Sequence, residues 1–198
     1  MSKQAATTNR RKRLTEERER EILDATFDLV AEVGYEQATV DEVARRTKAS
    51  TATLYRQWEN KPKLVITAMR ARKYPPLPPI DAGSLRDDLV TLARLLPEPH
   101  PQGAPTLGIW QAVGADPALA RALREVLFAP YLDALRTILA RHVERGTIRP
   151  GNPALAHAEM FLLGSVFVEK LFSGREADAD QLIAVMDALL LPALTSGS

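Results

Sequence analysis

The sequence predicts an all-α protein with a small N-terminal domain of short helices and a larger C-terminal helical domain. Three observations lead to this fold class. Hydrophobic residues recur three and four positions apart over most of the chain, which is the period of an amphipathic helix. No stretch shows the sustained alternation of apolar and polar residues that a half-buried strand needs. The segment Tyr74–Pro79 holds four prolines in six residues, which no helix interior tolerates, so we place the domain boundary there.

We expect a flexible basic arm over residues 1–14, an N-terminal domain over 15–75 and a C-terminal domain over 80–198. The arm holds a run of four cationic residues, Arg10–Arg13, without a hydrophobic partner. Two roles stay open for it, because a basic arm either reaches into a DNA minor groove or remains solvated.

The first helix is expected to run from Thr15 to Gly34. Thr15 can cap its N-terminus, and Glu16 and Glu17 in the first turn complement the helix dipole. A buried stripe is predicted from the helical spacing of Ile22, Leu23, Ala25, Phe27, Leu29 and Val30.

Two short helices follow. The first begins at Thr39, where Glu42 three residues on gives the pattern of a capping box. The chain turns over residues 47–49, and Ser50 or Thr51 caps the next helix. A fourth helix begins near Pro62, a residue favoured in the first turn.

The C-terminal domain is predicted to hold five helices. Ser84 and Asp87 cap the first, which ends near Leu96, and the others cover about residues 105–115, 116–146, 152–174 and 178–194. Pro130 lies inside the third of these and predicts a kink, because proline removes a backbone donor.

Charge is divided unevenly between the two domains. Residues 1–75 hold 16 Lys or Arg against 11 Asp or Glu, whereas residues 76–198 hold 10 against 14. This division favours a polyanionic partner for the front of the chain, although an ordinary solvated surface gives the same counts. No apolar run approaches the roughly 20 residues that cross a bilayer, and the start lacks the apolar core of a secretion signal. We therefore expect a cytoplasmic protein without a membrane partner. The absence of cysteine excludes disulfides and thiolate chemistry.

Two short helices joined by a tight turn, the second opening with small hydroxyl residues, fit the geometry in which a recognition helix enters the major groove of double-stranded DNA. The runs Thr39–Ala44, Ser50–Trp58 and Asn60–Lys61 also resemble the signature of the TetR family of transcriptional regulators. The resemblance covers about residues 15–72. The rest of the chain is similar to that family in length and helical layout only.

The resemblance implies a DNA-binding site made of Thr39, Ser50, Thr51, Ala52, Thr53, Tyr55, Arg56 and Lys61. Thr39 can offer its hydroxyl and amide to a phosphate, and the short side chains of residues 50–53 allow close approach to base edges. Tyr55 and Lys61 are expected to contact the sugar-phosphate backbone, and Arg56 a guanine or a phosphate. The alternatives are a half-buried aromatic at Tyr55 and ordinary exposed cations at Arg56 and Lys61.

One position departs from the family pattern. Many members have glycine in the turn where this chain has Lys48, so a position that favours positive φ carries a full side chain. The small core that holds the two helices in register is expected to contain Val43, Leu54 and Trp58.

The helix that begins at Asn152 is apolar almost all round and must be buried on two sides. The resemblance implies that it and the last helix form the four-helix interface of a homodimer, which binds a near-palindromic operator. Our candidate interface residues are Phe161, Gly164, Val168, Leu171, Leu182, Met186 and Leu189. A monomer with a thick core is the alternative.

The resemblance also implies repression, and a small-molecule pocket whose occupancy changes the separation of the two DNA-binding domains. The candidate lining residues offer apolar surface with a phenol and an indole N–H, and they are Trp110, Phe128, Tyr131, Met160 and Phe167. Because no basic cluster occurs among them, we expect an apolar effector rather than a polyanion. Ordinary core packing of these side chains is the alternative.

An enzyme finds little support in the sequence. His100, His142 and His157 are scattered without a metal-ligand spacing, and the chain has neither a glycine-rich phosphate loop nor a serine in a nucleophile motif. We expect no catalytic residue, metal or cofactor. The alternative function is a DNA-binding regulator without small-molecule control.

Overall fold

The computed structural model describes residues 14–74, 76–96, 109, 112–173 and 179–196, with the side chains of residues 166–173 excepted. All regular structure in this part of the chain is helical, which confirms the predicted fold class. The α-helices are α1 (Glu16–Gln37), α2 (Val40–Thr47), α3 (Thr51–Trp58), α4 (Lys61–Lys73), α5 (Leu85–Leu95), α7 (Pro117–Ala122), α8 (Ala129–Glu144), α9 (Ala158–Ser173), α10 (Ala179–Val185) and α11 (Leu191–Thr195). A 3₁₀ turn, Pro153–His157, precedes α9.

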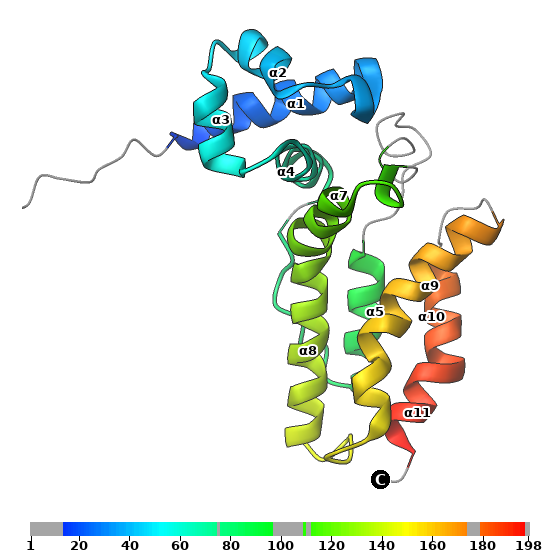
Figure 1. Cartoon of the computed structure of the whole chain (residues 1–198). Coiled ribbons are helices and arrows are strands. Elements are labelled where there is room, and N and C mark those ends of the chain that lie inside the picture. Colours follow the sequence, from blue (N-terminus) through cyan, green and yellow to red (C-terminus); the bar gives the residue numbers. More distant parts are fainter. Residues whose placement is uncertain (1–13, 75, 97–108, 110–111, 174–178, 197–198) are drawn as a thin grey trace, which may run out of the picture.

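The helices form two groups (Figure 1). Helices α1 to α4 make a head at one end of the molecule. Below it α5, α8, α9 and α10 run along one another as an elongated bundle, and α11 lies at the far end. Helix α7 lies where the head meets the bundle, and it contacts α4.

Helix α1 begins and breaks at the predicted residues. The Thr15 hydroxyl accepts a hydrogen bond from the Arg18 amide at 3.3 Å. Gly34 has φ 81° and ψ 165°, which are not helical, and a short further turn ends at Gln37. This conformation requires positive φ, so glycine suits the position.

Two prolines inside long helices are accommodated by π-helical turns. Helices α7 and α8 form one continuous rod through the π turn Leu123–Phe128, and α10 and α11 are joined through the π turn Met186–Leu190. In both cases the proline, Pro130 or Pro192, is the second residue of the α-helix that follows. A wider turn changes the hydrogen-bond register where the proline cannot donate. The kink expected at Pro130 is therefore a change of helical type just before it.

The buried side chains form two clusters, and the first crosses the predicted domain boundary. It contains the apolar residues of α1 to α4 and also residues of the C-terminal part, namely Ile109, Leu119, Ala122, Leu123, Leu127 and Phe128. The second cluster fills the bundle from Ile80 to Leu194. The proline linker thus separates the two parts along the chain, whereas the first core joins them in space.

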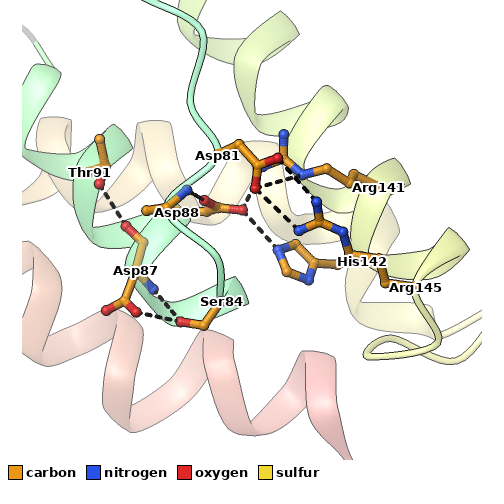
Figure 2. A network of polar contacts seen from close by, with 9 residues as sticks. Asp81, Ser84, Asp87, Asp88, Thr91, Arg141, His142 and Arg145 are labelled. Carbon is orange, nitrogen blue, oxygen red and sulfur yellow. Dashed lines mark hydrogen bonds and ion pairs between the residues drawn. The ribbon is translucent and has the colours of Figure 1, made fainter.

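A buried polar network holds α5 against α8 in the bundle (Figure 2). The Asp88 carboxylate is 0% exposed and accepts hydrogen bonds from Arg141 at 2.5 Å, from His142 Nε2 at 2.8 Å and from the Ala82 amide at 2.5 Å. Arg145 pairs with Asp81 beside this group at 3.0 Å. Burial opposes ionisation of Asp88, but the three donors outweigh it, so the pKa of Asp88 lies below its ordinary value.

Candidate nucleic-acid interface

Helices α2 and α3 form the predicted helix-turn-helix. The Thr39 hydroxyl accepts from the Glu42 amide at 3.2 Å, and the Ser50 hydroxyl accepts from the Thr53 amide at 3.1 Å, so each helix has a side-chain cap. Leu54 and Trp58 on α3 and Val43 on α2 are buried in the first cluster, as expected. These three side chains fix the angle between the two helices.

Only half of the expected capping box forms at α2. Instead of reaching back to Thr39, the Glu42 carboxylate accepts from Arg45 at 2.7 and 2.8 Å and from Arg46 at 2.9 Å. These hydrogen bonds lower the pKa of Glu42 to about 2. Arg46 also pairs with Glu32 on α1. Both arginines of α2 are therefore engaged with carboxylates of the head.

The turn between α2 and α3 has the backbone geometry that makes glycine common there. Lys48 lies in the left-handed region with φ 52° and ψ 33°, and its amide donates to the carbonyl groups that end α2. The expectation of positive φ at this position is confirmed, and the side chain of Lys48 is exposed. A cation thus projects from the turn, a feature that the sequence analysis did not assign to the DNA site.

The outer face of α3 is open to solvent. Tyr55 is 51% exposed although it is flanked by the buried Leu54, and Ala52, Arg56 and Gln57 are exposed as well. Thr51 and Thr53 are partly exposed. An exposed large aromatic beside short side chains and a cation matches the needs of a helix that lies in a groove and touches its walls. Gln57 extends this face and was also missed from the sequence.

Lys61, the first residue of α4, lies in a more structured environment than predicted. Its ammonium donates to the Glu36 carbonyl at 3.0 Å and stands 4.5 Å from the centre of the Tyr35 ring. The Tyr35 hydroxyl in turn donates to the Asp116 carboxylate at 2.8 Å. Burial lowers the pKa of Lys61, while the charges of Asp116 and Glu36 act in the opposite direction. Thr39 and Lys61 line one small hollow between α1, α2 and α4.

The structure does not bring the five candidate effector residues together. Phe128 is buried in the first cluster and Tyr131 in the second. The Met160 side chain is 74% exposed, so in this chain it lies on the surface and lines no cavity. Trp110 lies outside the described residues, and so does the side chain of Phe167.

A cavity of about 400 Å³ lies instead between the end of α4, the proline linker and α8. Its polar lining comes from Arg70 and Thr137, and the rest is apolar: Pro76, Leu77, Pro78, Pro79, Ile80, Pro130, Ala134 and Ile138. None of the candidate effector residues belongs to this lining.

The candidate dimer residues also divide. Leu182 and Met186 are only 5% and 3% exposed because they pack into the bundle core of their own chain, which differs from the expected interface. Leu189 is 59% exposed, Phe161 is partly buried, and a Cβ added at Gly164 would meet no atom within 4 Å. The side chains of Val168 and Leu171 lie outside the described residues.

Two absences concern the described residues alone. No helix there is long and apolar enough to cross a membrane. No group of His, Asp or Glu side chains in that part of the chain could hold a metal ion.

Two family models match the chain: bacterial regulatory proteins of the tetR family over residues 22–68, and the tetracyclin repressor-like C-terminal domain over residues 79–189. An HTH-type transcriptional regulator of Mycobacterium tuberculosis is 34% identical over 184 residues, which are 90% of this chain and 88% of that protein. The DNA-binding transcriptional repressor TetR of Mycobacteroides abscessus is 31% identical over 134 residues, 66% of this chain and 70% of that protein. The crystal structure of a TetR family transcription regulator shares the fold with a TM-score of 0.60 at 24% identity, covering 92% of this chain and 99% of that chain.

Proposed function

The chain belongs to the TetR family of bacterial transcriptional regulators, and on that premise we propose that it is a dimeric repressor that binds a near-palindromic operator and is released by a small, largely apolar effector. DNA-binding regulation follows from the family itself. Repression, the dimer and the effector are our proposal, and so is the residue-level DNA site.

The outer face of α3 carries the DNA-binding part of the proposal. Tyr55 and Arg56 are exposed on a helix whose opposite face is anchored by Leu54 and Trp58, so the helix presents them on a rigid support. We assign base contacts to Ala52, Thr53 and Arg56, and phosphate contacts to Tyr55 and Lys61, with Thr39, Ser50 and Thr51 at the helix N-termini.

The dimer is supported by an uncharged, exposed stripe along the last helices. The exposed residues there recur at helical spacing and include Gln181, Ala184, Ala188, Leu189, Pro192 and Ala193. Small residues allow two helices to approach closely, and Leu189 supplies the large apolar contact. We add Met160 of α9 to this surface, because its side chain is exposed on the neighbouring apolar helix. A four-helix contact of this kind sets the spacing of two recognition helices.

The effector part is supported by the cavity beside α4. Its volume falls in the range of small-molecule sites, and its lining is mostly apolar with one cation, Arg70. The cavity touches α4 of the head, the linker and α8 of the bundle. A ligand bound there would therefore contact both groups of helices, and any change in their relation would change DNA affinity by the same factor that DNA changes ligand affinity.

The test begins with selection of DNA from random oligonucleotides, followed by binding measurements by fluorescence anisotropy over a range of salt concentrations. We expect a near-palindromic sequence that binds two chains or a small multiple of two. Arg56→Ala should weaken binding to that sequence about 10- to 100-fold and relax discrimination at one base pair per half-site. Arg136→Ala is the matched control, because it removes the same charge from an exposed site on α8. If no sequence is enriched over random DNA, the proposal is rejected.

A further inference from the structure

We propose that Tyr35 and Asp116 are positioning residues for Lys61, which hold its ammonium group at the junction of α1 and α4 in place for a DNA phosphate. The inference rests on the proposed function, in which Lys61 is a phosphate contact. It adds two residues that touch no DNA, one of them from the C-terminal part of the chain.

The chain of contacts begins at Asp116, just before α7. One carboxylate oxygen accepts from the amides of Ala118 and Leu119 at 2.9 and 3.1 Å and so caps the helix. The other oxygen accepts from the Tyr35 hydroxyl at 2.8 Å. The carboxylate is therefore fixed by the helix that it caps, and it fixes the phenol of a residue 81 positions earlier.

The Tyr35 ring then positions the lysine. Tyr35 is buried at the end of α1, so its ring cannot turn freely, and the Lys61 ammonium stands 4.5 Å from the ring centre. A cation over an aromatic face is attracted by the negative face of the ring. A phenol that donates to a carboxylate becomes more electron-rich, which strengthens that attraction.

The geometry leaves the ammonium group a donor for DNA. A lysine ammonium has three N–H groups. One donates to the Glu36 carbonyl at 3.0 Å, and the Tyr35 ring covers a second side. Lys61 also lines the same small hollow as Thr39, whose helix N-terminus suits a phosphate. A phosphate bound at the start of α2 would therefore lie beside an ammonium that is already placed.

Pre-placement has an energetic consequence. A lysine side chain that moves freely loses much conformational entropy when it binds a phosphate, whereas one held by two contacts loses less. The charge of Asp116 also supports the charged form of Lys61 against the burial that lowers the pKa of the lysine. Because Asp116 caps α7, the placement of a head residue depends on where the C-terminal part begins its long helical rod.

The experiment is a double-mutant cycle on the intact chain, read out as affinity for the selected operator at several salt concentrations. Lys61→Met should lower the salt slope by about 0.9, the effect of one phosphate contact, while Lys63→Met on the same helix should leave it unchanged. Tyr35→Phe, which keeps the ring, and Asp116→Asn, which keeps an oxygen for the helix cap, should each weaken binding about 3- to 10-fold. In the Lys61→Met background the same two changes should have no further effect. Melting temperatures of all variants report whether the fold is retained.

The outcomes separate this inference from its premise. If Lys61→Met binds as tightly as Lys63→Met, Lys61 contacts no phosphate and the inference is overturned together with that part of the proposed function. If Lys61→Met loses the contact but Tyr35→Phe and Asp116→Asn weaken binding by the same factor in both backgrounds, the two residues support the fold generally. In that case the positioning role alone is overturned.

Discussion

Replacing Asp88 with Ala should destabilise the bundle by about 3–5 kcal/mol, the cost typical of removing one partner from a buried charge network. The structure shows why the cost is of this size. The carboxylate is fully buried, and His142, 2% exposed, has no other hydrogen-bond partner, since its Nδ1 is buried without one. The Ala82 amide also loses its acceptor. Each buried unsatisfied group costs about 1–3 kcal/mol. Arg141 keeps Asp81 at 3.8 Å, which limits the loss.

Urea unfolding followed by circular dichroism at pH 7 and fixed protein concentration measures this cost. Asp87→Ala is the matched control: Asp87 neighbours Asp88 on α5, but it is exposed and bonds only Ser84 with its side chain, so about 0.5–1 kcal/mol is expected. If the two variants differ by less than about 1 kcal/mol, the network does not stabilise the bundle as argued.

The same network predicts a dependence on pH. The pKa of Asp88 is lowered in the folded chain, so its contribution is fully present above its unfolded pKa of about 4 and is lost as the pH falls through the folded value. The stability difference between the wild type and Asp88→Ala should therefore be constant between pH 5 and 7 and should shrink below pH 4. A difference that grows on acidification would contradict the sign of this argument.

Two further predictions concern the turn and the dimer surface. Lys48→Gly should raise stability by about 0.5–1 kcal/mol in urea unfolding, because glycine adopts the left-handed region without the strain that a side chain adds; Ala49→Gly, at an ordinary φ, should lower it, and two equal effects would contradict the argument. Leu189→Glu should give folded monomers by light scattering, since the side chain is already exposed in a single chain and its change leaves the core intact. A folded dimer of that variant would remove Leu189 from the interface.

The helix boundaries of the head could be predicted because their signals are local. Thr15, Thr39 and Ser50 each cap the helix that follows, and Gly34 breaks α1. Caps and positive-φ positions depend on a few neighbouring residues, so the sequence alone carries the information. The exposed face of α3 followed from the same spacing, because Leu54 and Trp58 determine which side is buried.

Contacts between distant segments could not be predicted in this way. The spacing of Leu182 and Met186 shows that they lie on one apolar face, but not whether that face meets its own chain or a partner. The link from Tyr35 to Asp116 spans 81 positions and has no local signature. Met160 was assigned to a pocket for a related reason: an apolar residue on an apolar helix looks the same in a cavity and on an exposed surface.

The shared first core argues against an independent head, although the prolines of the linker favour one. Residues 1–75 alone would lose five large partners of the first cluster, namely Ile109, Leu119, Leu123, Leu127 and Phe128. At about 1.5–3 kcal/mol for each buried side chain, the loss is roughly 8–15 kcal/mol, as large as the stability of a typical domain. We therefore expect this fragment to lack a cooperative thermal transition and to expose Trp58, as measured by circular dichroism and tryptophan fluorescence. A fragment that melts cooperatively with a buried Trp58 would show that the head folds alone, and that an effector could move it as a separate body about the linker. If the fragment unfolds, an effector must act through the rod of α7 and α8, which belongs to both cores.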